Sequence, residues 1–255
     1  MKIFNESKEG LFGSSLNWIN ARLPYLYQNN IYPRWDIRNV NHGNPSDQDR
    51  ITPHIIKPKK QTTNSDTKVD LLNIERHQYT DFKDANFYFN EYFEFCSSIT
   101  DKLDIDFIPE KCLGIHFRGT DKLINNKDCK IINLNAFFLK LKSFLANRGF
   151  DSVFVISDDA DSKQSIISFL KGLGFTVLST DLSPHFHKTL ASNPDKLSIT
   201  KNSILEMLLL SKCQCVIKSH SAFSSWAKII NPDLEMYRVN ECKNNWFPDY
   251  YLPEF

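Results

Sequence analysis

Apolar and polar positions follow two different periods in the second half of the chain. Apolar runs of strand length occur at residues 112–117, 153–156, 175–178, 215–217 and 236–239. Between these runs, apolar residues recur every three to four positions, as on a buried helix face, within residues 136–145, 166–170, 200–212 and 222–230. Asn133 or Asn135 can cap the first of these helices. Strands that alternate with helices of this length predict a parallel sheet covered on both faces.

The first 110 residues have a weaker pattern. Residues 16–27 predict a helix, which Pro24 must kink or end, and residues 34–40 predict a strand. Residues 42–70 are polar and contain three prolines, a stretch too long for a simple connection in a compact fold. Residues 82–103 predict one aromatic-rich helix. Its buried face carries Phe89, Tyr92, Phe93, Cys96 and Ile99.

The contrast between the two halves predicts two lobes. We expect a small N-terminal α/β lobe, residues 1–108, and a better-formed C-terminal α/β lobe, residues 109–255. The tail of the second lobe should pack back on the protein. Its aromatic residues, 246–252, are expected to pack across the lobes or to offer a platform for sugar rings.

Composition excludes several classes of protein. Thirty-one Lys and Arg against 30 Asp and Glu leave a net charge of +1, which argues against nucleic-acid binding through bulk charge. The eight glycines form neither G-x-G-x-x-G nor a P-loop, so the usual dinucleotide and NTPase cradles are excluded. None of the six cysteines forms C-x-x-C, and buried free thiols are the simplest interpretation. Without an apolar run of signal-peptide or membrane-span length, we expect a cytoplasmic protein with no transmembrane segment.

One predicted strand runs directly into charged residues. Ligands of open α/β sheets bind outside the carboxyl ends of the strands, so this strand end is a candidate site. Side chains alternate along a strand, which places His116 and Arg118 on one face and Phe117 on the other. Gly119 lets the backbone approach a ligand closely, and the planar fork of Arg118 suits phosphate oxygens. A surface pair between Arg118 and Asp121 is the alternative.

Two further segments carry candidate binding groups. Glu206 lies in a helix that is apolar nearly all round, so its carboxylate needs a partner. The Watson–Crick edge of guanine could supply two N–H donors, and an internal ion pair with Lys or Arg could serve as well. Residues 219–224 bring small hydroxyl side chains to a helix N-terminus, which suits an anion. Plain N-capping explains the same residues.

Together these segments resemble the GT-B fucosyltransferase superfamily, which includes α1,2- and α1,6-fucosyltransferases and protein O-fucosyltransferases. Residues 116–122 are similar to the H-x-R-x-(G/T)-D motif, and closest to the T-D-K form of the α1,6 enzymes. Residues 204–226 are similar to the donor-site segment, with an S-x-F-S spelling nearer to the α1,2 enzymes. Residues 153–159 match a strand that ends in S-D-D, and residues 10–35 have a weaker likeness to a rhizobial member.

The resemblance implies a GT-B-like fold of two Rossmann-like lobes, with a mostly parallel sheet in the C-terminal lobe and a reduced N-terminal lobe. By this resemblance, residues 1–108 would form the acceptor side and residues 109–255 would bind the nucleotide sugar. It implies an inverting transfer of fucose from GDP-fucose to a glycan, without metal or other cofactor. The implied donor-binding residues are His116, Arg118, Gly119, Asp158, Glu206, Ser219, Ser221, Ala222 and Phe223. The implied catalytic residues are Arg118, Asp121 and Lys122. In this set His116 and Glu206 would contact the guanine base, and Arg118 with the turn at 221–223 would bind the pyrophosphate.

The chain departs from the family pattern at three positions. Glu206 stands where the family commonly has Asp, and Gly119 replaces the second Arg of the α1,6 pattern. Asn126 stands where that pattern has Glu. The catalytic base therefore stays open between Asp121 and Asp128.

Two other functions compete with this one. The D-x-D triplets at residues 104–106 and 159–161 are typical of metal-dependent glycosyltransferases that use another nucleotide sugar, in which carboxylates hold a divalent ion. The second triplet is better explained as a helix cap at Asp159. A non-catalytic protein that binds a sugar nucleotide or a glycan is the other alternative, since no base is assigned. The expected partners are a nucleotide-sugar donor and a glycan acceptor, and no nucleic acid.

Overall fold

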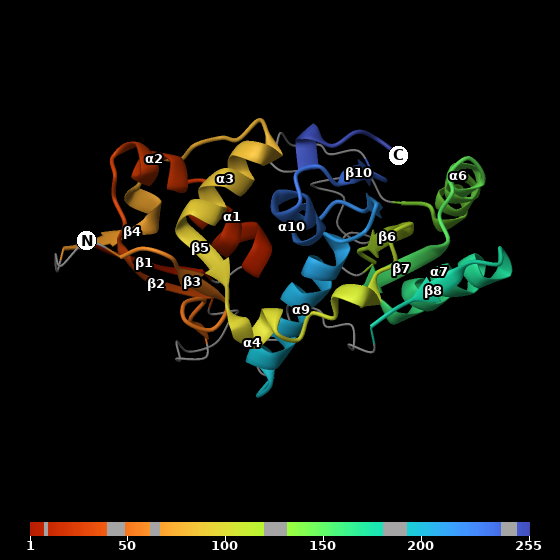
Figure 1. The fold of residues 1–255 in the computed structure, drawn as a ribbon, viewed down its shortest axis with the longest axis horizontal. Coiled ribbons are helices and arrows are strands. Elements are labelled where there is room, and N and C mark those ends of the chain that lie inside the picture. Colours follow the sequence, from red (N-terminus) through yellow and green to blue (C-terminus); the bar gives the residue numbers. More distant parts are fainter. Residues whose placement is uncertain (8–9, 40–48, 62–66, 120–131, 181–192, 241–248) are drawn as a thin grey trace. The chain divides into compact units, whose positions relative to one another are not determined.

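The computed structural model describes residues 1–7, 10–39, 49–61, 67–119, 132–180, 193–240 and 249–255 (Figure 1). Contacts divide the chain into two compact units. The first comprises Met1–Leu103 with His187–Leu205, and the second comprises Asp104–Phe186 with Glu206–Phe255. The division into lobes at residue 108 stays a prediction.

The second unit contains the predicted parallel sheet. Its strands run in the order β10 (Glu235–Arg238), β9 (Cys215–Lys218), β6 (Cys112–Phe117), β7 (Ser152–Ser157) and β8 (Thr176–Leu178). Each neighbouring pair is parallel. The three central strands are buried along their whole length, as expected for strands covered on both faces. All five strands lie within one residue of their predicted bounds.

Helices α6 (Leu134–Ala146) and α7 (Ala160–Gly172) cover one face of this sheet. Alternate strand residues form a common hydrophobic core with them: Leu113, Ile115, Phe117, Val153, Val155, Phe137, Leu141, Ile166 and Leu170. The Asn133 side chain caps α6 by accepting from two backbone N–H groups, and the Asp159 carboxylate caps α7. Both predicted caps are confirmed, with Asn133 as the cap of α6.

Helices α9 (Lys196–Leu210) and α10 (Ala222–Ile230) cover the other face. A Cβ atom at Gly114 would lie only 2.9 Å from the Leu210 side chain, so the glycine lets the end of α9 pack directly on β6. On the same face the Lys218 amine reaches Ser225 of α10, 2.6 Å away. The sheet is therefore covered on both faces, as the sequence predicted.

The first unit contains two small sheets. Strands β2 (Arg34–Asn39), β1 (Lys2–Ser7) and β4 (Lys68–Asp70) form a parallel sheet in that order. Strands β3 (Ile56–Pro58) and β5 (Phe93–Phe95) form an antiparallel pair. The sequence did not predict β1, because two of its three buried side chains, Asn5 and Ser7, are polar and hide the apolar alternation.

Two helices predicted in this unit are broken. The predicted helix at 82–103 is α3 (Phe82–Tyr92) followed by strand β5 and the short helix α4 (Ser97–Thr100). The prediction was wrong there because aromatic residues suit a strand as well as a helix, and pairing with β3 decides. A π-helical segment (Leu11–Leu16) precedes α1 (Asn17–Asn20) and α2 (Leu23–Gln28), and Pro24 lies in the first turn of α2. Proline is tolerated there because the missing N–H is unpaired anyway.

The described tail, residues 249–255, packs on the second unit. The Arg238 backbone N–H donates to the Pro253 carbonyl at 2.9 Å, and the Phe255 N–H donates to the Arg238 carbonyl at 2.8 Å. The Phe255 ring contacts Phe144, with centroids 5.2 Å apart. The remaining aromatic tail residues, 246–248, lie outside the described residues.

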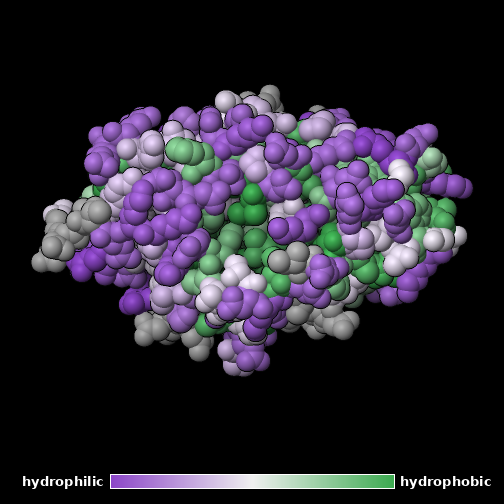
Figure 2. Space-filling model, in the orientation of Figure 1, coloured by the Kyte–Doolittle hydropathy of each residue, from purple (hydrophilic) through white to green (hydrophobic). Residues whose placement is uncertain are grey.

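Hydrophilic residues predominate on the face in Figure 2. Leu139 of α6 is the most exposed large apolar side chain of the described residues. Within the described ranges, no helix combines the length and the apolar character needed to cross a bilayer.

Candidate functional site

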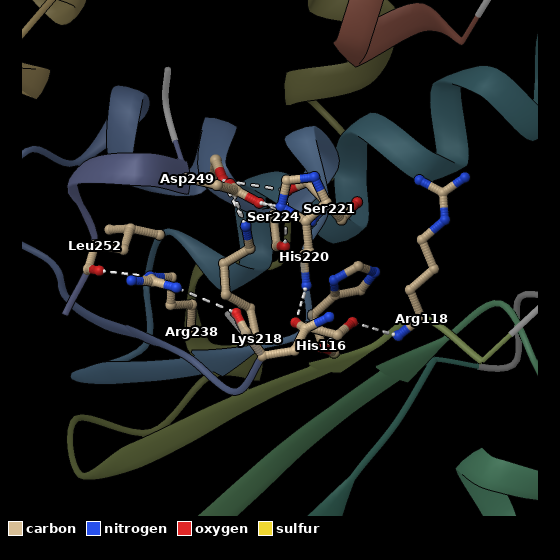
Figure 3. Close-up of polar contacts among 12 residues, drawn as sticks. His116, Arg118, Lys218, His220, Ser221, Ser224, Arg238, Asp249 and Leu252 are labelled. Carbon is tan, nitrogen blue, oxygen red and sulfur yellow. Dashed lines mark hydrogen bonds and ion pairs between the residues drawn. The ribbon is translucent and has the colours of Figure 1, made fainter. Parts of the chain in front are cut away.

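The carboxyl ends of β6, β7 and β9 bring several predicted site residues together. The strand register pairs His116 with Ile156 of β7 and with Lys218 of β9. The residues that follow these positions therefore leave the sheet at one edge, where ligands of parallel sheets bind. In Figure 3 His116 lies between Lys218 and Arg118, beside the turn that leads into α10.

His116 is a buried, neutral imidazole. It is 5% exposed, and burial lowers its pKa to about 3, assisted by the positive charges of Lys218 and Arg118. Its ring lies 4.9 Å from the ring of Phe223, the second residue of α10. Its Nδ1 atom has no hydrogen-bond partner among the described residues. One ring nitrogen is therefore open for a hydrogen bond to a ligand.

Arg118 is held at the edge by its neighbours. Its backbone N–H donates to the Ser219 hydroxyl at 2.7 Å, and its Nε lies 3.7 Å from Asp158 Oδ2. The Gly119 N–H donates to the other Asp158 oxygen at 2.9 Å. A Cβ at Gly119 would lie 2.7 Å from the Cβ of Asp159. Glycine is therefore needed here because the backbone passes close to the start of α7, and not because of a ligand, which is what the sequence predicted. The guanidinium remains about one-fifth exposed and accessible to an anion.

The N-terminus of α10 has an unusual cap. Ser221 occupies the N-cap position, but its side chain makes no capping hydrogen bond. The residue is 2% exposed, and its hydroxyl oxygen has no partner among the described residues. Plain N-capping by Ser221 is therefore not what the structure shows. Ala222 and Phe223 follow as the first two residues of the helix.

A buried charged group lies directly behind this turn. Lys218 is fully buried, and its amine donates to Asp249 Oδ1 at 2.5 Å. Asp249 Oδ2 accepts from the Ser221 N–H at 2.9 Å and lies 2.7 Å from His220 Nδ1. Burial raises the pKa of Asp249, but Lys218 and His220 outweigh this effect and hold the pKa below its usual range. The carboxylate therefore stays charged.

Sequence reasoning missed this charged group. A lysine that ends the apolar run at 215–217 was a usable signal, because a buried lysine requires an acidic partner. Asp249 had no comparable signal, since it lies 31 residues further on, in an aromatic stretch without periodicity. Asn240, which accepts from the His220 N–H at 2.7 Å, was missed for the same reason.

Glu206 belongs to a separate group. Its carboxylate accepts a hydrogen bond from the Thr180 hydroxyl, which follows β8. Burial raises the pKa of Glu206, while Thr180 and the charge of Lys163 act in the opposite direction. Lys163 donates to the Thr180 carbonyl at 3.0 Å. Among the described residues no Lys or Arg forms an ion pair with Glu206, so the alternative of an internal ion pair is not found there.

The remaining candidates have different outcomes. Asp121, Lys122 and Asp128 lie outside the described residues, so the catalytic base stays a prediction. In the D-x-D triplets, Asp104 and Asp159 each accept from a backbone N–H two or three residues further on, as cap residues do. Within the part of the chain that the structure describes, no three His, Cys, Asp or Glu side chains gather as a metal site.

Comparisons with known proteins bear on the fold. No family model matches the chain, and no curated protein matches its sequence. NodZ alpha-1,6-fucosyltransferase soaked with GDP-fucose is similar, with a TM-score of 0.57 and 11% identity over 96% of this chain and 99% of that chain. The fucosyltransferase NodZ from Bradyrhizobium has a TM-score of 0.57 and 12% identity over 91% and 93%. A likeness over nearly the whole of both chains shows that this protein has the GT-B-like α/β fold of these fucosyltransferases, as the sequence predicted.

Proposed function

We propose that this protein is a glycosyltransferase that transfers fucose from GDP-fucose to a glycan, with inversion at the anomeric carbon and without a metal ion. One observation carries the proposal: two buried polar atoms, His116 Nδ1 and Ser221 Oγ, lack a partner in the described residues beside the cationic Arg118. Buried polar groups are almost always hydrogen-bonded in folded proteins, so this place suits a polar ligand. The fold likeness to a fucosyltransferase soaked with GDP-fucose supports the choice of donor.

The diphosphate is proposed to bind between Arg118 and the N-terminus of α10. Arginine offers a planar fork of N–H donors that matches phosphate oxygens, and a helix N-terminus favours negative charge. The Ser221 hydroxyl and the backbone of Ala222 and Phe223 would complete this cradle. Asp158, which holds Gly119 and lies near the Arg118 guanidinium, would orient the arginine.

The guanine base is proposed to bind Glu206. A carboxylate can accept two N–H bonds from the Watson–Crick edge of guanine, whereas uracil has a single ring N–H and no amino group there. Burial already makes the carboxylate of Glu206 costly to charge, which its raised pKa reflects. N–H donors of a bound base would stabilise the charged form. His116 is the second proposed contact of the base, through its open ring nitrogen.

In the proposed reaction the acceptor hydroxyl attacks the anomeric carbon of fucose. The bond from that carbon to the β-phosphate oxygen breaks, GDP leaves, and a base takes the hydroxyl proton. Attack from the face opposite to the leaving group inverts the anomeric centre. Arg118, assisted by Lys122, would stabilise the negative charge that develops on the β-phosphate. Asp121 or Asp128 is the proposed base.

A thermal-shift panel with GDP, UDP, CMP and GDP-sugars tests the donor, because a ligand that binds the native state raises its melting temperature. We expect GDP and GDP-fucose to stabilise the protein and UDP and CMP to have little effect. Incubation with GDP-fucose and a panel of glycan acceptors then tests transfer. Binding without turnover on every acceptor would favour the non-catalytic alternative.

We also propose a cytoplasmic location. Cys96, Cys112, Cys213 and Cys215 are free thiols, and three of them are buried. The prediction of buried free thiols is confirmed for those three. Free thiols are typical of a reducing compartment.

A further inference from the structure

The carboxylate of Asp249, from the C-terminal tail, contacts the turn that forms the proposed diphosphate site. We infer that Asp249 is a positioning residue, which holds the turn between β9 and α10 in the conformation that binds the donor. The inference rests on the proposed function, because the turn is the proposed diphosphate cradle. The predicted donor-binding and catalytic residues included neither Asp249 nor Lys218, and His220 lay in the predicted segment 219–224 without a role of its own.

Four donors converge on this one side chain. Asp249 Oδ1 accepts from the Lys218 amine and from the Ser225 hydroxyl. Asp249 Oδ2 accepts from the Ser221 backbone N–H at 2.9 Å and contacts His220 Nδ1 at 2.7 Å. These donors begin at the last residue of β9 and end in the first turn of α10. Asp249 therefore ties together both ends of the turn, as Figure 3 shows.

Asp249 also replaces a local helix cap. In a capping box, a Glu or Gln in the first turn accepts from the N–H of the N-cap residue. Here the corresponding position is Ser224, whose hydroxyl lies 3.5 Å from the Ser221 carbonyl instead. Asp249, 28 residues further along the chain, accepts the hydrogen bond from the Ser221 N–H. The cap is thus made without the Ser221 hydroxyl, which stays available to a ligand.

The tail that carries Asp249 is firmly anchored. Leu252 is 3% exposed, its N–H donates to the Asp249 carbonyl at 3.2 Å, and its carbonyl accepts from Arg238 Nε at 2.9 Å. The backbone of Arg238, in the strand beside β9, pairs with Pro253 and Phe255. Asp249 is therefore fixed relative to the strand end that it holds, as a positioning residue must be.

Two variants separate positioning from stability. Asp249→Asn removes the carboxylate that pairs with the buried Lys218 amine, so the melting temperature should fall. The double variant Lys218→Met/Asp249→Leu removes both charges and fills the space with apolar groups, a change that is often neutral or stabilising at buried ion pairs. Its melting temperature should return close to that of the wild type. We expect both variants to bind GDP at least tenfold more weakly than the wild type in calorimetry.

Amide hydrogen exchange without nucleotide provides a readout that does not depend on the donor. In both variants the amides of residues 221–225 should exchange faster, while those of β6 and β7 stay protected. Glu254→Gln is the matched control, because it removes a tail carboxylate that pairs with Arg238 and is 62% exposed. This control should change neither exchange at residues 221–225 nor GDP affinity.

The possible results are distinct. A double variant that binds GDP as tightly as the wild type would show that Asp249 serves stability alone, and the inference would be wrong. Unchanged exchange at 221–225 would overturn it as well, whether or not GDP binds. If the amides of residues 221–225 exchange faster in both variants but the wild type does not bind GDP, the proposed donor is wrong. The result would still support Asp249 as the residue that holds the turn.

Discussion

Arg118 and its neighbour Phe117 should respond to substitution in opposite ways. The two residues are adjacent in sequence, yet the Phe117 side chain lies in the core between β6 and α6, and Arg118 lies at the edge of the sheet. We expect Arg118→Ala to abolish most fucose transfer while the protein keeps its fold. We expect Phe117→Ala to weaken the fold instead.

The expected magnitudes follow from the contacts. Removal of a group that stabilises charge in the transition state typically costs about 3–4 kcal/mol, or 10²–10³ in kcat. The Arg118–Asp158 pair is 3.7 Å apart and partly exposed, so its loss should cost less than about 1 kcal/mol of stability. Phe117 is 1% exposed, with its ring centroid 5.9 Å from that of Phe137. Its truncation should cost about 3–5 kcal/mol.

The assay measures turnover per folded molecule and the melting temperature of each variant. For a protein of this size, each 1 kcal/mol corresponds to a melting shift of roughly 2–4 °C. The two substitutions should therefore separate clearly by melting temperature. Arg118→Lys keeps the charge but loses the planar fork, so it should restore little activity.

The opposite pattern would refute this assignment. An Arg118→Ala protein that melts much earlier, yet turns over normally per folded molecule, would show that Arg118 is a structural residue. The proposed diphosphate site would then lose its central cation. A Phe117→Ala protein with wild-type stability would show that the two faces of β6 are assigned wrongly.

Three further predictions concern the preference for guanine, the need for a metal ion and the dependence of stability on pH. Glu206→Gln places a donor opposite the donors of guanine, so the preference for GDP over UDP in a thermal-shift assay should fall by roughly 1–3 kcal/mol; equal stabilisation of the wild type by GDP and UDP would contradict this role. EDTA should leave transfer unchanged, and a loss that manganese restores would favour the D-x-D alternative. The folded protein keeps His116 neutral down to about pH 3, whereas the unfolded chain protonates it near pH 6.5, so stability should fall as the pH decreases through this window. His116→Gln should show a shallower fall in chemical denaturation, and identical slopes for both proteins would contradict the buried neutral state.

Local sequence patterns predicted most of the second unit. Its three central strands are buried on both faces and form apolar runs, and α6 and α7 each have one apolar face, so these elements could be predicted without knowledge of their neighbours. In the first unit the same reasoning missed β1 and predicted a continuous helix where β5 interrupts it. Polar side chains on a buried face and pairing with a distant strand carry no local signal.

The candidate site divides in the same way. Alternation and strand length are local properties, so the amino-acid pattern already indicated that His116, Arg118 and the residues around Ser221 stand at strand ends. The pairing of Asp249, in the tail, with Lys218 and with the turn before α10 is a result of the fold and has no counterpart in the local pattern. A buried charge is stabilised by whichever opposite charge the fold brings beside it, and that choice depends on chain packing over many residues rather than on any pattern along the chain.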